Sequence, residues 1–187
     1  FDLPYMVGRH ALYNVIDFMK HTMVKNQSAK VKEIKWSSSA YKNQEFHCLI
    51  AEGRIYVDLL PIVQRDLRLS NYKLSTVASK FLKNITKDPL EARDIFRCYD
   101  IGVKNIYNDS EKAKKAISLV GKYCVKDSEI VAKLFNVLTV WVGLCEMSKI
   151  TSVPVFDLFT RGQQIKVFSQ VYTKCTKEGR AVERDKY

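Results

Sequence analysis

The chain has 187 residues, of which 47% are hydrophobic, and this is enough for one domain with a sizeable core. Its 31 Lys and Arg against 20 Asp and Glu give a net charge of +11, which favours a polyanionic partner such as nucleic acid. Five cysteines without Cys-x-x-Cys spacing and three scattered histidines argue against a disulfide framework and a zinc site. No signal peptide or bilayer-length apolar run is visible, so we expect a reduced, intracellular protein with no membrane segment.

The first predicted element is a helix from residue 2 to about residue 20. Asp2 is a good N-cap and Pro4 suits the first helical turn. Residues 20–42 then hold six lysines against one acid, Glu33, and we interpret them as a loop and the edge of a strand. This lysine-rich surface either faces DNA or is simply solvated, and the sequence favours neither.

A hairpin and five helices are predicted after the lysine-rich segment. The strands are expected at residues 46–50 and 54–57, on either side of a turn at Glu52-Gly53. Asp109 and Asp157 are interpreted as helix caps, and the longest helix is expected to break near Gly143. The helices are predicted at residues 59–65, 74–82, 89–99, 110–147 and 156–175.

Tyr123 and Asp127 are the most informative pair, because residues four apart lie on one face of a helix. An apolar stripe continues through Asp127 without a break, which aims the carboxylate at the interior. A buried carboxylate needs a donor, a cation or a metal ion as partner. For Asp127 alone, a cap of a neighbouring element remains the alternative, and for Tyr123 a core aromatic. The other residues of the stripe are Ala113, Ala116, Ile117, Val120, Cys124, Val131, Leu134, Leu138 and Trp141.

Together with the first two residues, Tyr123 and Asp127 form a pattern that resembles the 3'-5' proofreading exonuclease domain of family B DNA polymerases. The resemblance is strongest to the polymerases of large double-stranded DNA viruses. Phe1-Asp2 matches the end of the second exonuclease motif, an aromatic residue followed by Asp. Tyr123 and Asp127 match the third motif, Tyr-x-x-x-Asp.

Two further segments are similar to the same family, in the same order. Residues 53–60 and 71–78 resemble the strand that leads into the Ser-Tyr-Lys-Leu helix, with Asn71 in the usual Ser place. Residues 161–166 resemble the segment that enters the polymerase palm. Four ordered motifs are more specific than any one of them, and together they cover almost the whole chain.

The sequence differs from the family pattern in its first exonuclease motif and in the polymerase palm motifs. The first motif, Asp-x-Glu on a strand, is expected well upstream of Phe1 and is therefore not part of this sequence, and no palm motif is found. Two Asp-x-Glu triplets do occur, at residues 109–111 and 127–129, but they follow the second motif and fall at a helix start and inside a helix. We interpret the first triplet as capping chemistry.

The resemblance implies a mixed α/β fold: part of a ribonuclease H-like exonuclease domain, helix-rich with a β-hairpin. It places the C-terminal part of this domain at residues 1–155 and a helix leading into the palm at residues 156–187. It also implies an enzyme, a DNA-directed DNA polymerase with metal-dependent 3'-5' exonuclease activity in DNA replication. The fragment alone is expected to be inactive, because two of four acidic ligands are missing.

The site implied by the resemblance uses two Mg²⁺ or Mn²⁺ ions, held in part by Asp2 and Asp127, with Tyr123 orienting the attacking water. The two carboxylates are expected within roughly 8 Å of each other. Partners are the single-stranded 3' end of a primer, the rest of the polymerase chain and, in some polymerases, a processivity factor. The expected DNA contacts are Phe1, Tyr72, Lys73 and Leu74, with Arg161 and Lys166 packing against the palm as the alternative to a DNA role.

A module of the same fold with a silent nuclease site, acting as a nucleic-acid-binding or structural part, is the alternative function. Retention of Asp2, Tyr123 and Asp127 favours the nuclease. For a viral polymerase, the expected location is the cytoplasm or nucleus of the host cell.

Overall fold

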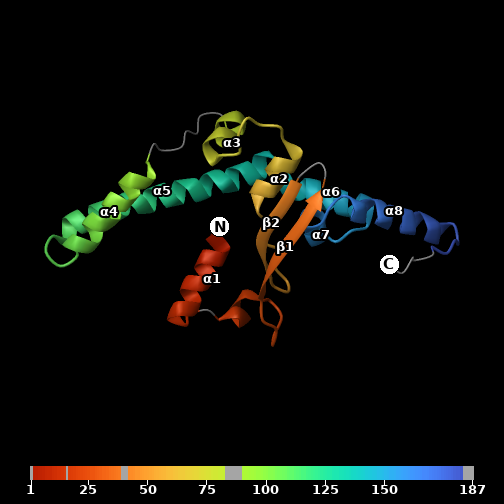
Figure 1. Cartoon of the computed structure of the whole chain (residues 1–187), viewed down its shortest axis with the longest axis horizontal. Coiled ribbons are helices and arrows are strands. Elements are labelled where there is room, and N and C mark those ends of the chain that lie inside the picture. The colour runs from red at the N-terminus through yellow and green to blue at the C-terminus, as the bar shows by residue number, and fades with distance from the viewer. Residues whose placement is uncertain (1, 16, 39–41, 83–89, 183–187) are drawn as a thin grey trace. The chain divides into compact units, whose positions relative to one another are not determined.

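The computed structural model describes residues 2–15, 17–38, 42–82 and 90–182 (Figure 1). The chain divides into two compact units. The first is formed by Phe1–Arg65 with Gly143–Tyr187, and the second by Asp66–Val142. This division was not expected from composition.

The first unit begins with helix α1 (Asp2–Tyr13), which starts where the sequence predicted and ends earlier. The prediction that this helix reaches residue 20 is wrong, because Asn14 adopts a left-handed backbone conformation with φ 51° that ends the helix. A short 3-10 helix, η1 (Phe18–His21), follows. Helix α1 packs against strand β2 (Lys42–Ile50) of the hairpin.

The sheet is one antiparallel hairpin of β1 (Lys30–Ser38) and β2, with Lys30 opposite Ile50 and Ser38 opposite Lys42. The predicted strand at residues 46–50 is therefore the end of β2, but its partner comes from the lysine-rich segment and not from residues 54–57. The interpretation of this segment as a loop and the edge of a strand is confirmed for residues 30–38, which form β1. Charged side chains pair within and across the hairpin: the Lys35 ammonium lies 2.9 Å from Glu33 of the same strand and 3.4 Å from Glu45 on the opposite strand. The pairing lowers the pKa of Glu33 and raises the pKa of Lys35.

The predicted turn at Glu52-Gly53 is confirmed, since Ala51 and Arg54 form an isolated antiparallel bridge around it. Gly53 has φ 81°, in the left-handed region that favours glycine. Its turn is held to the preceding chain by the Met23 amide, which donates to the Glu52 carbonyl at 2.8 Å.

The change Gly53→Ala is expected to destabilise the protein by about 1–3 kcal/mol, because alanine is strained at this backbone conformation. A Cβ there would also lie 2.7 Å from the Cβ of Met23, which cannot rotate away. Gly121→Ala is the matched control: this helical position has nothing within 4 Å, and alanine should stabilise it by about 0.5–1 kcal/mol. The measurement is the urea midpoint of unfolding, and a midpoint for Gly53→Ala equal to that of the parent would contradict the role of this turn.

The remaining helices of the first unit carry much of its buried surface. Helix α2 (Leu59–Asp66), which was predicted at residues 59–65, buries Ile62 and Val63. Helix α6 (Val140–Thr151) is followed by the short helix α7 (Val155–Thr160), which buries Leu158 and Phe159, and by α8 (Gln164–Lys177). The Arg65 guanidinium donates to the carbonyl of Leu158 at 3.1 Å, which connects α2 with α7.

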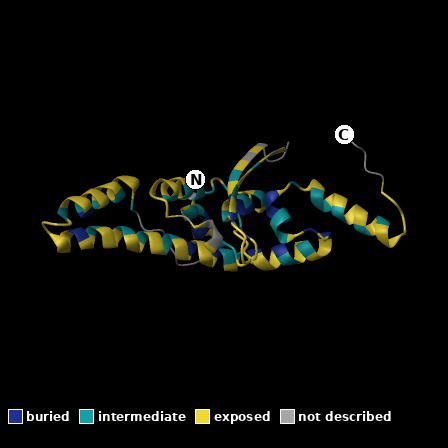
Figure 2. Ribbon diagram, turned by 90° about the horizontal axis from the view of Figure 1, so that it is seen from below, coloured by how far each residue is buried: buried dark blue, intermediate teal, exposed yellow. Residues whose placement is uncertain are grey.

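The prediction of one helix over residues 156–175 is wrong, since α7 and α8 are separate. Arg161 follows α7 in an extended conformation, with φ −120° and ψ 160°, and Gly162 comes next. Helix α8 has no buried residue along its length, all of which is described (Figure 2). Its apolar side chains at Val167 and Phe168 are 59% and 61% exposed.

The second unit consists of α3 (Leu74–Phe81), α4 (Ala92–Asn105) and α5 (Ser110–Val137). Helices α4 and α5 form a helical hairpin along much of their length, and α3 also packs on α5 (Figure 1). Gly102 is buried where α4 meets α5, and a Cβ there would lie 2.5 Å from the tip of Ile117. The predicted start of α4 at residue 89 lies outside the described residues.

The break in the long predicted helix lies earlier than Gly143. Helix α5 ends at Val137 and α6 begins at Val140, because Thr139 has a left-handed φ of 47°. Within the described residues no single helix is long and apolar enough to cross a membrane, and α5 and α6 meet that length and composition test only when joined across the break. The described fold is thus helix-rich with one antiparallel hairpin, as expected at this level.

Candidate functional site

Tyr123 and Asp127 lie one turn apart on α5, and both side chains are half-buried. The buried residues of α5 are Ala113, Ile130 and Leu134, and at 100° per residue Tyr123 and Asp127 fall on the same face of the helix. The prediction that the apolar stripe continues through Cys124 is wrong, since this thiol is exposed. Asp127 is half-buried, so its side chain is in contact with both the protein and the solvent.

In the acidic triplets at 109–111 and 127–129, the acids other than Asp127 have structural roles. The Asp109 carboxylate accepts a hydrogen bond from the backbone N–H of Lys112 at 3.0 Å, which confirms its role as the N-cap of α5. Glu129 lies 2.6 Å from Lys133, and this ammonium lowers the pKa of the Glu129 carboxyl. Glu111 pairs with Lys114 at 3.6 Å. All three acids thus have local structural partners.

Asp2 is the first residue of α1, but its side chain lies outside the described part of the structure, as does Phe1. A pocket of about 720 Å³ lies beside the start of α1, between this helix, β2 and the start of α2. One of its acids, Asp58, accepts from the N–H of Leu60 at 2.9 Å and so caps α2. A second, Glu45, pairs with Lys35.

The Tyr72-Lys73-Leu74 segment leads into α3. The Tyr72 hydroxyl donates to the carbonyl of Leu67 at 2.9 Å, which holds this half-buried ring within its own unit. Asn71 accepts from the N–H of Lys73 at 3.1 Å and from the Thr76 hydroxyl at 2.7 Å, so it organises the start of the helix. Only the Lys73 side chain of the three is exposed, and contacts of this segment with DNA stay a prediction.

The interpretation of Asp157 as a helix cap is wrong in detail, because Pro154 is the N-cap of α7. Asp157 lies in the first turn and its Oδ1 accepts from Nε of Arg161 at 3.0 Å. This pair spans the end of α7. Lys166, in the first turn of α8, is half-buried.

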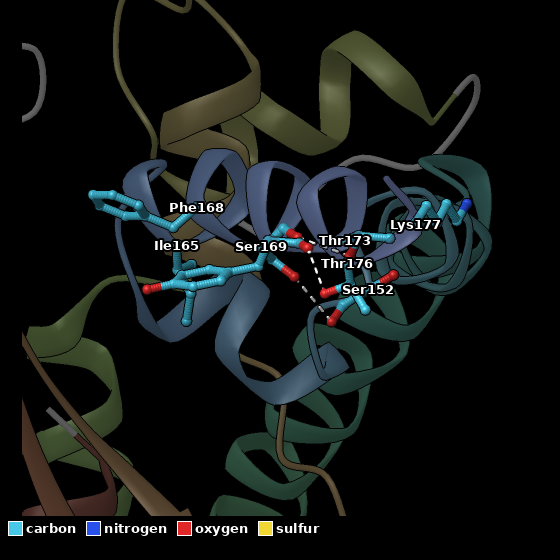
Figure 3. Close-up of a pocket in the computed structure, with 8 residues that line it drawn as sticks. Ser152, Ile165, Phe168, Ser169, Thr173, Thr176 and Lys177 are labelled. Carbon is cyan, nitrogen blue, oxygen red and sulfur yellow. Dashed lines mark hydrogen bonds between the residues drawn. The ribbon is translucent and has the colours of Figure 1, made fainter. Parts of the chain in front are cut away.

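A second pocket, of about 650 Å³, lies along α8 and includes the chain before α7 (Figure 3). Its two threonine hydroxyls donate to backbone carbonyls: Thr173 to Ser169 at 2.8 Å and Thr176 to Tyr172 at 2.9 Å. The Ser169 hydroxyl donates to the carbonyl of Ser152 at 3.3 Å. The Ser169 bond connects α8 with the chain between α6 and α7, whereas the two threonine bonds lie within α8.

Comparison with known proteins decides the family. Residues 1–77 match the family described as DNA polymerase family B, exonuclease domain. The DNA polymerase 120R of Invertebrate iridescent virus 3 is 48% identical over 188 aligned residues, covering 100% of this chain and 16% of the viral protein. The chain belongs to the family B DNA polymerases.

Other polymerases of this family show the same relation over almost the whole chain. The putative DNA polymerase 060R of Frog virus 3 is 40% identical over 97% of this chain and 17% of its own length. The DNA polymerase delta catalytic subunit of Candida albicans is 30% identical over 95% of this chain and 16% of its own length. The chain therefore spans about one sixth of the curated polymerases that it matches.

Side chains that could hold a metal ion are not clustered in the part of this polymerase segment that the structure describes. Among the described residues, no three His, Cys, Asp or Glu side chains gather where they could hold an ion. Asp127 supplies one hard oxygen donor group of the kind that Mg²⁺ prefers, and Asp2 a second in the sequence. Asp2 belongs to the first unit and Asp127 to the second, so their separation stays a prediction.

Proposed function

We propose that this chain is part of the metal-dependent 3'-5' proofreading exonuclease of a family B DNA polymerase and acts on single-stranded 3' ends during replication. The observation that carries the proposal is the half-buried pair of Tyr123 and Asp127, one turn apart on α5. Its support is the family match of residues 1–77, which includes the motif residue Asp2. The resemblance to iridovirus polymerases favours a viral enzyme.

Each residue of the pair has a chemical role that its position suits. Asp127 is a metal ligand together with Asp2, and both act with acidic residues outside this chain. Two divalent ions, when bound, neutralise the scissile phosphate and activate a water. The Tyr123 hydroxyl positions that water, because a phenol both donates and accepts hydrogen bonds.

The finer fold and the substrate path belong to the same proposal. The helices and hairpin are the C-terminal part of a ribonuclease H-like domain over residues 1–155, and residues 156–187 lead into the palm. Phe1 and the segment from Tyr72 to Leu74 contact the terminal nucleotides. Aromatic stacking and basic groups along the backbone are the usual means of holding a single strand. The partners are the remainder of the polymerase chain and, for long synthesis, a processivity factor.

Replacing Tyr123 by Phe in the full-length polymerase tests the role of the hydroxyl. We expect excision of a mispaired 3' nucleotide to slow by about 10- to 100-fold, since a misplaced reactant costs up to two orders of magnitude. Tyr107→Phe is the control, because this tyrosine is 95% exposed after the end of α4. Rates come from single-turnover excision of a labelled primer. Equal rates for the two variants would show that Tyr123 is only a packing residue.

A further inference from the structure

Helix α5 carries four lysines on one side, at Lys115, Lys122, Lys126 and Lys133, which we call the lysine row. Their spacing of seven, four and seven residues keeps them within about 40° of one another around the helix axis. The row extends for about 27 Å along the helix at 1.5 Å per residue. It lies about a third of a turn away from the buried face, so the side chains of Lys115 and Lys122 are exposed.

Two of the four lysines of the row, Lys115 and Lys122, carry charges that no described residue compensates. Lys133 pairs with Glu129, and Lys126 is half-buried, with its charge close enough to contribute to the lowered pKa of Glu129. Lys115 and Lys122 form no ion pair with any residue that the structure describes. Lys114, by contrast, lies on another side of α5 and pairs with Glu111. Clustered cations without partners on one face are the electrostatic footprint of a polyanion site.

We propose that the lysine row binds the phosphate backbone of the single DNA strand that is being excised. A straight row suits an extended strand. In duplex DNA, a strand completes a turn in about 34–36 Å, so over about 27 Å it would wind away from a straight helix. A flexible single strand can follow the row from end to end.

The row lies next to the proposed catalytic pair, and the inference rests on the proposed function. Lys122 directly precedes Tyr123, and Lys126 directly precedes Asp127. Consecutive residues of a helix are about 100° apart, so the row and the pair occupy neighbouring faces of α5. A strand held on the row is thereby brought beside the carboxylate, with the lysines contributing to binding and Asp127 to chemistry.

The test is the steady-state excision of single-stranded oligodeoxythymidylate by the full-length polymerase at a series of salt concentrations. For Lys115→Gln/Lys122→Gln we expect KM to rise several-fold with kcat unchanged. The slope of log(kcat/KM) against log salt should fall in magnitude by about 1.4, since each phosphate contact with a single strand contributes about 0.7. Lys80→Gln/Lys114→Gln is the matched control: it removes the same charge from the second unit, and both parameters should stay those of the parent.

The result for the row can be separated from the result for the nuclease. If the double variant keeps the KM and salt slope of the control while Asp127→Asn abolishes excision, the row is not the strand site and the proposed function stands. If Asp127→Asn excises normally, the proposed function fails. The row is then judged by fluorescence anisotropy of the same oligonucleotide, where an unchanged salt slope in the double variant overturns it. Weakened binding of a blunt duplex by the same factor would also overturn the single-strand assignment.

Discussion

Replacing Asp127 by Ala in the full-length polymerase is expected to lower excision of a mismatched 3' end by several orders of magnitude. The change removes a proposed ligand of the two metal ions. Because these ions stabilise both the attacking and the leaving oxygens, the transition state loses stabilisation at both atoms. Nucleotide addition should stay close to that of the parent, because that chemistry belongs to the palm. The side chain is half-buried, and its loss should leave the fold intact.

Glu129→Ala is the control for this experiment. Glu129 lies on the same helix two residues away, is exposed, and is engaged with Lys133. Single-turnover excision and primer extension are measured on the same preparation, which separates proofreading from polymerisation. An Asp127→Ala enzyme that proofreads as fast as the Glu129→Ala enzyme would refute the assignment of the third motif. Loss of both activities would indicate a folding defect, and thermal melting identifies it.

The 187-residue chain, prepared by itself, is expected to show no magnesium-dependent cleavage of a 3' end. It supplies at most Asp2 and Asp127 of the four acidic ligands that the family uses, and Asp2 is next to the terminal amino group. Weak binding of single-stranded DNA should remain, falling steeply as salt rises, because the net charge is +11. Exposed apolar side chains on α8, such as Phe168, should also promote aggregation.

The measurement is degradation of a labelled oligonucleotide with and without magnesium, with the Asp127→Ala chain as control for contaminating nuclease. Robust cleavage by the parent chain and none by the variant would show that this chain holds a complete site. Asp109 and Glu111 would then be the first candidates for the additional ligands, despite the capping bond of Asp109 and the pairing of Glu111 with Lys114.

The local features of this protein could be predicted from its sequence. Tyr123 and Asp127 share a helix face because four residues make about one turn, and this needs no tertiary information. The capping role of Asp109 is equally local, since its carboxylate reaches a backbone N–H only three residues ahead. The turn at Gly53 was predicted for the same reason, because a glycine acts on the backbone within a few residues.

Only the tertiary structure decided the features that depend on residues far apart or on competition between neighbouring conformations. Strand β1 forms because β2 is there to pair with it, and the salt bridge from Lys35 to Glu45 connects the two strands. The ends of α5 and α7 were missed because Thr139 and Arg161 adopt non-helical conformations at residues whose propensities do not require it. The exposure of side chains on α5 was also decided by tertiary packing. Cys124 lies in an apolar pattern, but the residues that α5 buries are Ala113, Ile130 and Leu134, and the Cys124 thiol is exposed.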